Sequence, residues 1–381
     1  MFVSVYAIAK NEEKFCESFM KSALEADEIV VLDTGSTDGT VAKLRELGAS
    51  VTEADISPWR FDVARNRSLE LVSPEADVCV CFDLDELLTP GWRAAVESVW
   101  DAGVTEQGHY RYVWSYNADD SEGATFTREK IHAPGVFEWT HPVHEVLTRT
   151  DGKSDVKSVY IPGFTCEHHA DNAKSRSDYL PLLEMSVKED PQDDRNTHYL
   201  GREYMYRCMW NKAIKTLERH LSLKSARWAP ERCASMRFIG RCYDALGKRD
   251  DAAEWFERAC LECPQLREPW YEAAMHWYGA AIDGRARPVR EGICATEQLR
   301  VEWARVIDYG EMALSITARQ DNVYIQDAAA WGSLLYQNLT VAYDKTGRKT
   351  DALKMAALAL LVGDKSDTGL WNNLSYAAGC V

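Results

Sequence analysis

The N-terminal part of the chain alternates short apolar runs with segments in which apolar residues recur at helical spacing. The apolar runs lie at residues 2–8, at the start of 28–40, at 48–55 and at 77–83. Helical spacing separates them, most clearly at about 40–47 and 61–72. Short strands that alternate with helices indicate a mostly parallel sheet with crossover connections. We therefore expect a Rossmann-like α/β domain at the N-terminus.

Two later segments favour antiparallel strands that extend this sheet. Residues 109–117 and 123–133 alternate apolar and polar side chains, which is the period of a half-buried strand. The N-terminal sheet is thus expected to be mixed. Residues 174–188 have helical spacing, and after them no strand pattern is present. The C-terminal part is therefore expected to be all helical.

Three segments of the C-terminal part can be superimposed on one another. They begin at Leu200, Ile239 and Leu339. Matching positions are Tyr204, Tyr243 and Tyr343, then Ala213, Ala252 and Ala352, with Gly247 and Gly347 at the turns of two segments. We expect a further, degenerate unit at 268–316, with residues 285–293 as an inserted loop. The units resemble tetratricopeptide repeats, in which helix–turn–helix pairs stack into a solenoid.

This resemblance predicts the domain organisation and a class of partner. We expect an α/β domain at 1–175, a helical linker at 176–195 and a tetratricopeptide-like repeat domain at 196–381. A solenoid offers a concave face for a protein or peptide, or for self-association. The many tryptophans of this part are expected mainly to form its core.

Composition excludes some classes of function. The chain has 381 residues and a formal net charge of −16, which argues against a nucleic-acid-binding surface because phosphate contacts need clustered lysine and arginine. We find no signal peptide and no apolar run of transmembrane length. The eleven cysteines form no paired C-x-x-C sets, so we expect reduced thiols and a cytoplasmic protein.

Acidic residues follow the apolar run at 77–83. Asp83 and Asp85 are two positions apart, so in an extended strand they would point the same way. Two carboxylates at the carboxyl end of a strand suit a hard divalent cation, although a solvated acidic turn would show the same letters. Asn11 and Asp33 follow the first two strands. Ligands of parallel sheets bind at these strand ends, so the sequence predicts a binding site at this edge.

Four blocks of sequence carry a resemblance to a known family. They are AIAKNEE (7–13), EIVVLDTGSTDGT (28–40), FDVARNRSL (61–69) and CFDLDELLTPGW (81–92). Over roughly the first ninety residues of this chain, their order and spacing resemble the four successive blocks of family 2 glycosyltransferases, which have the GT-A fold. The resemblance implies transfer of a sugar from a nucleoside diphosphate donor, with a UDP-sugar expected. It also implies inversion at the anomeric carbon. The expected cofactor of the enzyme is Mn²⁺ or Mg²⁺.

The resemblance also implies roles for individual residues. The donor nucleotide is expected to contact Ala7, Ala9, Asn11, Glu12, Asp33, Gly35, Ser36, Asp38, Arg65 and Asp83. Asp33 can also cap its own turn, and Arg65 can instead form a surface salt bridge. The expected metal ligands are Asp83, Asp85 and one of two adjacent histidines, with His168 preferred to His169. Imidazole suits manganese better than magnesium.

An inverting transfer needs a carboxylate that takes the proton of the acceptor. Glu145, which follows His144, is our first choice, with Glu86 and Glu138 as alternatives. The pair at 144–145 can also simply hold its loop. The acceptor is expected to be a hydroxyl group on a protein or a glycan. The competing interpretations are a non-catalytic repeat scaffold with a nucleotide-sensing domain and a sugar-nucleotide pyrophosphorylase, which usually has a glycine-rich basic loop that AIAKNEE lacks.

Overall fold

The chain divides into two compact units, Met1–Ser186 and Val187–Val381, in a computed structural model. The structure describes all residues except 117–121, 172–178, 284–294, 321–323, 325–326 and 380–381. Each unit is described by itself below. The domain boundaries given above remain predictions.

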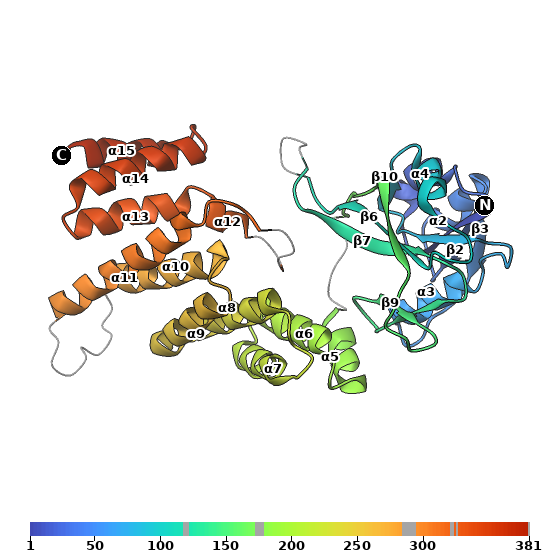
Figure 1. The fold of residues 1–381 in the computed structure, drawn as a ribbon, viewed down its shortest axis with the longest axis horizontal. Coiled ribbons are helices and arrows are strands. Elements are labelled where there is room, and N and C mark those ends of the chain that lie inside the picture. Colours follow the sequence, from blue (N-terminus) through green and yellow to red (C-terminus); the bar gives the residue numbers. More distant parts are fainter. Residues whose placement is uncertain (117–121, 172–178, 284–294, 321–323, 325–326, 380–381) are drawn as a thin grey trace. The chain divides into compact units, whose positions relative to one another are not determined.

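The first unit contains a mixed sheet with helices (Figure 1). Its strands are β1 (Val3–Ala9), β2 (Glu28–Asp33), β3 (Ser50–Glu53), β4 (Val78–Cys81), β5 (Glu86–Leu88), β6 (Gln107–Val113), β7 (Thr125–His132), β8 (Phe137–Thr140), β9 (Val146–Arg149) and β10 (Ser158–His168). Its helical segments are η1 (Glu13–Phe15, a 3₁₀ turn), α1 (Cys16–Ala23), α2 (Thr40–Glu46), α3 (Phe61–Leu69) and α4 (Trp92–Val99), and α5 (Tyr179–Glu189) runs across the division between the units.

The sheet has the strand order β3-β2-β1-β4-β7-β6-β10-β5. Strands β1 to β4 pair in parallel, whereas β7 is antiparallel to both β4 and β6. Strand β10 is parallel to β6 and antiparallel to the short β5. The predicted mixed α/β sheet is therefore confirmed. The separate hairpin β8–β9 was not predicted.

The two faces of β1 pack against different elements because successive side chains alternate. Val3, Val5 and Ala7 belong to an apolar cluster that also contains Phe19 of α1 and Trp92 of α4. On the other face, Tyr6 lies in a cluster with residues of β2, β4 and β8, against which Leu69 of α3 packs. The sheet is thus covered on both faces, and the carboxyl ends of β1, β2 and β4 are left for loops.

A chain of buried hydrogen bonds connects the hairpin to the sheet. Trp139 Nε1 donates to the Tyr6 hydroxyl at 2.8 Å, and that hydroxyl lies 2.8 Å from His132 Nε2. His132 Nδ1 lies 3.0 Å from the Ala133 carbonyl, which can only accept. The proton is therefore on Nδ1, and Nε2 accepts from Tyr6. Every partner is satisfied only while His132 is neutral.

We expect the first unit to lose stability between pH 7 and pH 5. Burial lowers the pKa of His132 from 6.5 to about 4, and the hydrogen bond to Ala133 offsets this only in part. Because the folded state keeps His132 neutral, the free energy of unfolding is unaffected by this group above pH 6.5. It decreases below that pH as the histidine takes up a proton in the unfolded state. The expected loss is about 2 kcal/mol at pH 5. Urea unfolding at both pH values would measure it, with His132→Gln as comparison; an equal pH dependence in parent and variant would contradict the assignment.

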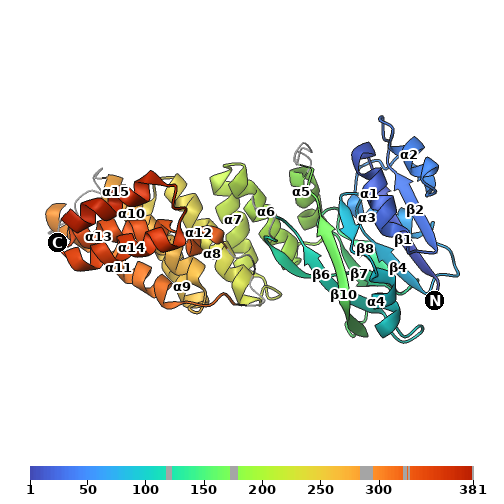
Figure 2. The same ribbon diagram turned by 90° about the horizontal axis from the view of Figure 1, so that it is seen from above.

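The second unit is all helical (Figure 2). Its helices are α6 (Asp194–Tyr206), α7 (Trp210–Ser222), α8 (Ala229–Ala245), α9 (Arg249–Glu262), α10 (Arg267–Asp283), α11 (Ala295–Ser315), α12 (Ala328–Trp331), α13 (Leu334–Lys345), α14 (Lys349–Val362) and α15 (Thr368–Gly379). The pairs α6–α7, α8–α9 and α13–α14 correspond to the three segments superimposed above, and α10–α11 to the degenerate unit. The predicted inserted loop at 285–293 lies outside the described residues.

Glycines allow the helices of a pair to approach closely. A Cβ atom on Gly201 of α6 would lie 2.5 Å from the Leu217 side chain of α7, and one on Gly240 of α8 would lie 2.8 Å from Phe256 of α9. These glycines occupy equivalent positions in the first two repeats. Within the described residues, no helix is long and apolar enough to cross a membrane.

Candidate active site

The loops after β1 and β2 are joined at the carboxyl edge of the sheet. The register pairs Ala9 with Asp33, so both loops leave the sheet at the same level. The backbone N–H of Asn11 donates to Ser36 Oγ at 2.8 Å, and Asn11 Oδ1 accepts from the Thr37 N–H at 2.7 Å. Asn11 has a positive φ of 54°, a conformation that asparagine tolerates better than most residues. Asn11 and Ser36, both expected at the donor nucleotide, thus lie together.

Asp33 caps the turn that follows it. One of its carboxylate oxygens accepts from the N–H groups of Gly35 and Ser36 at 3.0 and 2.8 Å, and the other accepts from the Ser36 hydroxyl. Gly35 has a φ of 98°, which favours glycine. The turn-capping role that we considered for Asp33 is therefore present, and its use by a nucleotide remains a prediction.

Four other residues expected at the donor nucleotide either lie within β1 or form hydrogen bonds with the start of α2. Ala7 and Ala9 are buried in β1. The Glu12 N–H donates to Thr40 Oγ1 at 2.8 Å, and Asp38 accepts from the Thr40 N–H at 3.0 Å. Asp38 thereby satisfies a backbone N–H in the first turn of α2, where such groups have no intrahelical partner.

Strand β4 ends earlier than the predicted run 77–83. The strand stops at Cys81, because Asp83 and Glu86 close a turn: the Asp83 N–H donates to Glu86 Oε2 at 2.8 Å, and the Glu86 N–H donates to the Asp83 carbonyl at 2.9 Å. The expectation that Asp83 and Asp85 point the same way assumed an extended strand. In the turn they face different partners.

Asp83 and Glu145 share one buried arginine. Arg65 of α3 is 4% exposed; its Nε donates to Glu145 Oε1 at 2.6 Å, and its Nη2 lies 2.9 Å from Asp83 Oδ1. The guanidinium also lies over the Trp139 ring, 5.1 Å from its centroid. Asn66 of α3 holds the β8–β9 hairpin in place, because its side-chain amide makes two hydrogen bonds of 2.8 Å with the backbone of Trp139 in β8. The alternative of a surface salt bridge for Arg65 does not fit this burial.

Lys130 of β7 is a second cation in the cluster. Its Nζ lies 3.2 Å from Asp83 Oδ2 and 3.4 Å from each carboxylate oxygen of Glu86. Glu86 is 2% exposed and also accepts from the Tyr112 hydroxyl at 2.6 Å. Glu86, an alternative base, is thus surrounded by protein partners. Glu138, the other alternative, is exposed on β8 between the buried Phe137 and Trp139.

The cations keep the carboxylates ionised. Burial raises the pKa of Asp83, but Arg65 and Lys130 outweigh burial and hold that pKa well below its usual range. The same balance lowers the pKa of Glu145, with Arg65 as the main opposing charge. Burial disfavours charge on Lys130 too, yet Asp83 and Glu86 raise its pKa. Asp83, Glu145 and Lys130 are therefore charged at neutral pH.

Asp85 lies beside His168 at the end of β10. His168 Nε2 is 3.7 Å from Asp85 Oδ2, while its Nδ1 is 3.0 Å from the Trp114 carbonyl. The carbonyl can only accept, so Nδ1 donates and Nε2 is directed toward Asp85. An outer hydrogen bond of this kind orients metal-binding histidines. His169 is instead near Glu167, at 3.6 Å, and stacks on Tyr116.

Aromatic side chains adjoin His168. The Trp114 ring stacks on the imidazole with centroids 4.6 Å apart and an interplanar angle of 18°. Trp114 and Phe126 are both partly open to solvent, at 39% and 44%. Arg128 lies over the buried Tyr112, 5.0 Å from the ring centroid. The carboxyl edge of the sheet thus combines carboxylates, cations and exposed aromatic faces.

The sequence interpretation missed Lys130, Arg128 and Trp139. Arg128 and Lys130 are two positions apart on β7, at the point where the pairing of β7 with β6 shifts its register. The alternation in TFTREKIH was the available signal, and it was used only to predict a strand.

Comparisons with known proteins agree with both units. Residues 4–105 match the model of the family described as glycosyl transferase family 2, and residues 235–269 match that of the tetratricopeptide repeat. Among solved structures, MamA is 17% identical, with a TM-score of 0.35 over 48% of this chain and 84% of that chain.

A second solved structure is glucosyl-3-phosphoglycerate synthase from Mycobacterium tuberculosis in complex with Mn²⁺, uridine diphosphate and glucosyl-3-phosphoglycerate. It is 28% identical, with a TM-score of 0.26 over 29% of this chain and 44% of that chain. The match spans less than half of the synthase, and both TM-scores are too low to carry an argument. The assignment therefore rests on the family models and the mixed sheet: residues 4–105 belong to a family 2 glycosyltransferase domain of the GT-A fold, and the chain is a glycosyltransferase that also has tetratricopeptide repeats.

Proposed function

We propose that this glycosyltransferase is metal-dependent and inverting, and that it moves a sugar from a nucleoside diphosphate donor, a UDP-sugar, to a hydroxyl group. The observation that carries the proposal is the pair formed by Asp85 and His168 beside Asp83, at the carboxyl edge of the parallel strands. Carboxylate oxygen together with an imidazole nitrogen suits Mn²⁺. We further propose a cytoplasmic location.

The proposed metal ligands are Asp83, Asp85 and His168. Asp85 and His168 fit the role best, since the carbonyl of Trp114 fixes the ring so that Nε2 faces the carboxylate. Asp83 already contacts Arg65 and Lys130. It can bind the metal only if Lys130 moves away from one of its carboxylate oxygens. When bound, the metal would act as a Lewis acid that stabilises the departing nucleoside diphosphate.

The buried cations are proposed to act on the diphosphate. Arg65 and Lys130 stay charged at neutral pH in spite of their burial, because the neighbouring carboxylates raise the pKa of both. A phosphate oxygen can replace a carboxylate oxygen as their acceptor, and charge-assisted bonds of this type are among the strongest in proteins. The loops that carry Asn11, Asp33 and Ser36 would then hold the nucleoside.

Glu145 is the proposed base that takes the acceptor proton. Its carboxylate is ionised and lies in the same cluster as Asp83, with Arg65 between them. The acceptor is proposed to be a protein or a glycan. The exposed rings of Trp114 and Phe126 offer apolar faces to it, and the repeats offer a surface for a partner.

The donor can be identified by a thermal-shift screen of nucleoside diphosphates and their sugars, with and without Mn²⁺. A ligand present at 100 times its dissociation constant stabilises the folded state by about 2.7 kcal/mol. We expect UDP and a UDP-sugar to raise the midpoint of unfolding only with the metal. If no nucleoside diphosphate shifts the midpoint with Mn²⁺ or Mg²⁺, the proposed donor site is wrong.

A further inference from the structure

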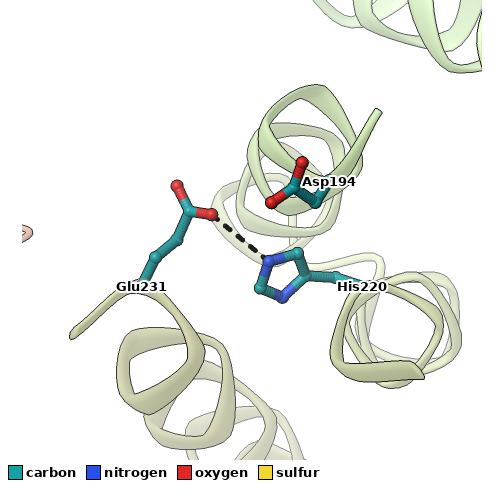
Figure 3. A group of neighbouring side chains, drawn as sticks. All are labelled: Asp194, His220 and Glu231. Carbon is teal, nitrogen blue, oxygen red and sulfur yellow. Dashed lines mark hydrogen bonds and ion pairs between the residues drawn. The ribbon is translucent and has the colours of Figure 1, made fainter. Parts of the chain in front are cut away.

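A histidine and two carboxylates meet in the helical unit, far along the chain from the donor site. Asp194 is the first residue of α6, His220 lies near the end of α7, and Glu231 is in the first turn of α8. Figure 3 shows the three side chains pointing toward one another from these three helices. One oxygen or nitrogen atom from each lies within 4.8 Å of the others. Nothing in the glycosyl transfer requires this cluster.

The imidazole of His220 is held so that Nε2 faces the carboxylates. Nε2 is 3.3 Å from Glu231 Oε1, and Nδ1 is 2.9 Å from Ser235 Oγ. The same hydroxyl lies 2.7 Å from His198 Nδ1, so the two rings are connected through Ser235. His220 and His198 are fully buried. A hydrogen bond on one ring nitrogen that leaves the other directed at carboxylates is the arrangement of a metal-bound histidine.

The cation that faces the two carboxylates is the His220 imidazole, which carries a charge only when it is protonated. Glu231 is 7% exposed and Asp194 is half-buried, so both carboxylates are at least partly removed from water. In the part of the chain that the structure describes, no lysine or arginine forms an ion pair with either of them. The nearby Arg232 is bonded to Glu262 at 2.6 Å and to two backbone carbonyls. Buried carboxylates are normally paired or bound to a metal.

The ligand types also match a metal ion. Zn²⁺ in proteins takes histidine nitrogen and carboxylate oxygen, and three protein ligands leave a position for water. Neighbouring ligands about 2 Å from one ion are a little over 3 Å apart, as His220 Nε2 and Glu231 Oε1 are. The Asp194 carboxylate is the more exposed ligand, and one of its oxygens lies within 4.8 Å of the ligand atoms of the other two residues.

We propose that Asp194, His220 and Glu231 form a binding site for a divalent transition-metal ion, zinc or manganese, that fastens α6, α7 and α8 together. This site is independent of the proposed donor metal, and its failure would leave the proposed function untouched. Without a metal, the cluster is a histidine–glutamate pair with an adjacent aspartate, and the experiment separates the two.

The test is a zinc titration of the full chain in competition with a chromophoric chelator. The variants are Asp194→Asn and His220→Gln, and the matched control is Glu218→Gln, which removes one exposed charge from α7. Any zinc bound at the donor site is common to all variants. We expect the control to bind as the parent does, and each ligand variant to lose one equivalent or to bind it at least about tenfold more weakly.

Hydrogen exchange supplies a second readout that does not depend on catalysis. Zinc is expected to slow exchange in peptides of α6 to α8 in the parent and in Glu218→Gln, but not in Asp194→Asn. Asp194 is the decisive position if His220→Gln does not fold, because it is half-buried and its side chain makes no hydrogen bond with the described residues. Equal zinc affinity in Asp194→Asn and Glu218→Gln, or no protection of these helices in the parent, would overturn the proposal.

Discussion

Asp85→Asn is expected to weaken metal-dependent donor binding and to lower the rate of glycosyl transfer by about 10²–10³-fold, the usual cost in rate of removing one electrostatic stabiliser of a transition state. The side chain keeps its size and loses its charge. His168 stays oriented by the Trp114 carbonyl, so the remaining site has one imidazole and a carboxylate already shared with two cations. Calorimetry with a UDP-sugar and Mn²⁺ measures the binding, and initial rates measure the transfer.

The fold should tolerate this change. The Asp85 backbone carbonyl accepts from the His169 N–H at 2.7 Å, and asparagine retains that bond. Glu46→Gln, at an exposed position of α2, removes the same charge elsewhere in the domain and should behave as the parent. If Asp85→Asn binds the donor with parental affinity in the presence of Mn²⁺, the assignment of Asp85 as a metal ligand is wrong, even if turnover is reduced.

Local patterns carried the prediction of the α/β core. The strands β1, β2 and β4 are short, apolar and followed by turn residues, so the hydrophobic pattern and the turn residues indicated the same elements. Parallel pairing then brings the ends of these strands to one edge, which is why Asn11 and Asp33 could be expected near each other from the sequence alone. The helical repeats were visible for a similar reason: equivalent residues recur at the same places in each unit.

The charges around Asp83 depend on contacts that local patterns do not encode. Lys130 reaches Asp83 because β7 pairs with β4, with Val80 opposite Ile131, and that pairing joins residues 51 positions apart. The choice between His168 and His169 depends likewise on the register of β10, in which His168 lies opposite Glu86. The sequence pattern predicted which strand ends meet at one edge, while the contacts of each side chain required the tertiary structure.

Glu145→Gln is expected to reduce turnover by about 10²–10⁴-fold, the range for loss of a general base, with little change in donor affinity. Glutamine keeps the shape of the side chain, and its carbonyl oxygen can still accept from Arg65 Nε. The arginine therefore stays in place for the diphosphate. The matched control is Glu138→Gln, which neutralises the exposed glutamate of β8 and tests the alternative base in the same assay.

The competing role for Glu145 is to position Arg65, and the two roles differ in what they change. A positioning residue would weaken donor binding together with turnover, whereas a base leaves binding intact. The pH profile adds a second distinction. Arg65 lowers the pKa of Glu145 against the opposing effect of burial, so the base is ionised at neutral pH. Turnover of the parent should then fall only at a pH below that at which an ordinary glutamate titrates, and this acid limb should disappear in Glu145→Gln. If the variant keeps the acid limb of the pH profile, or loses donor affinity in proportion to turnover, then Glu145 positions Arg65 and another residue is the base.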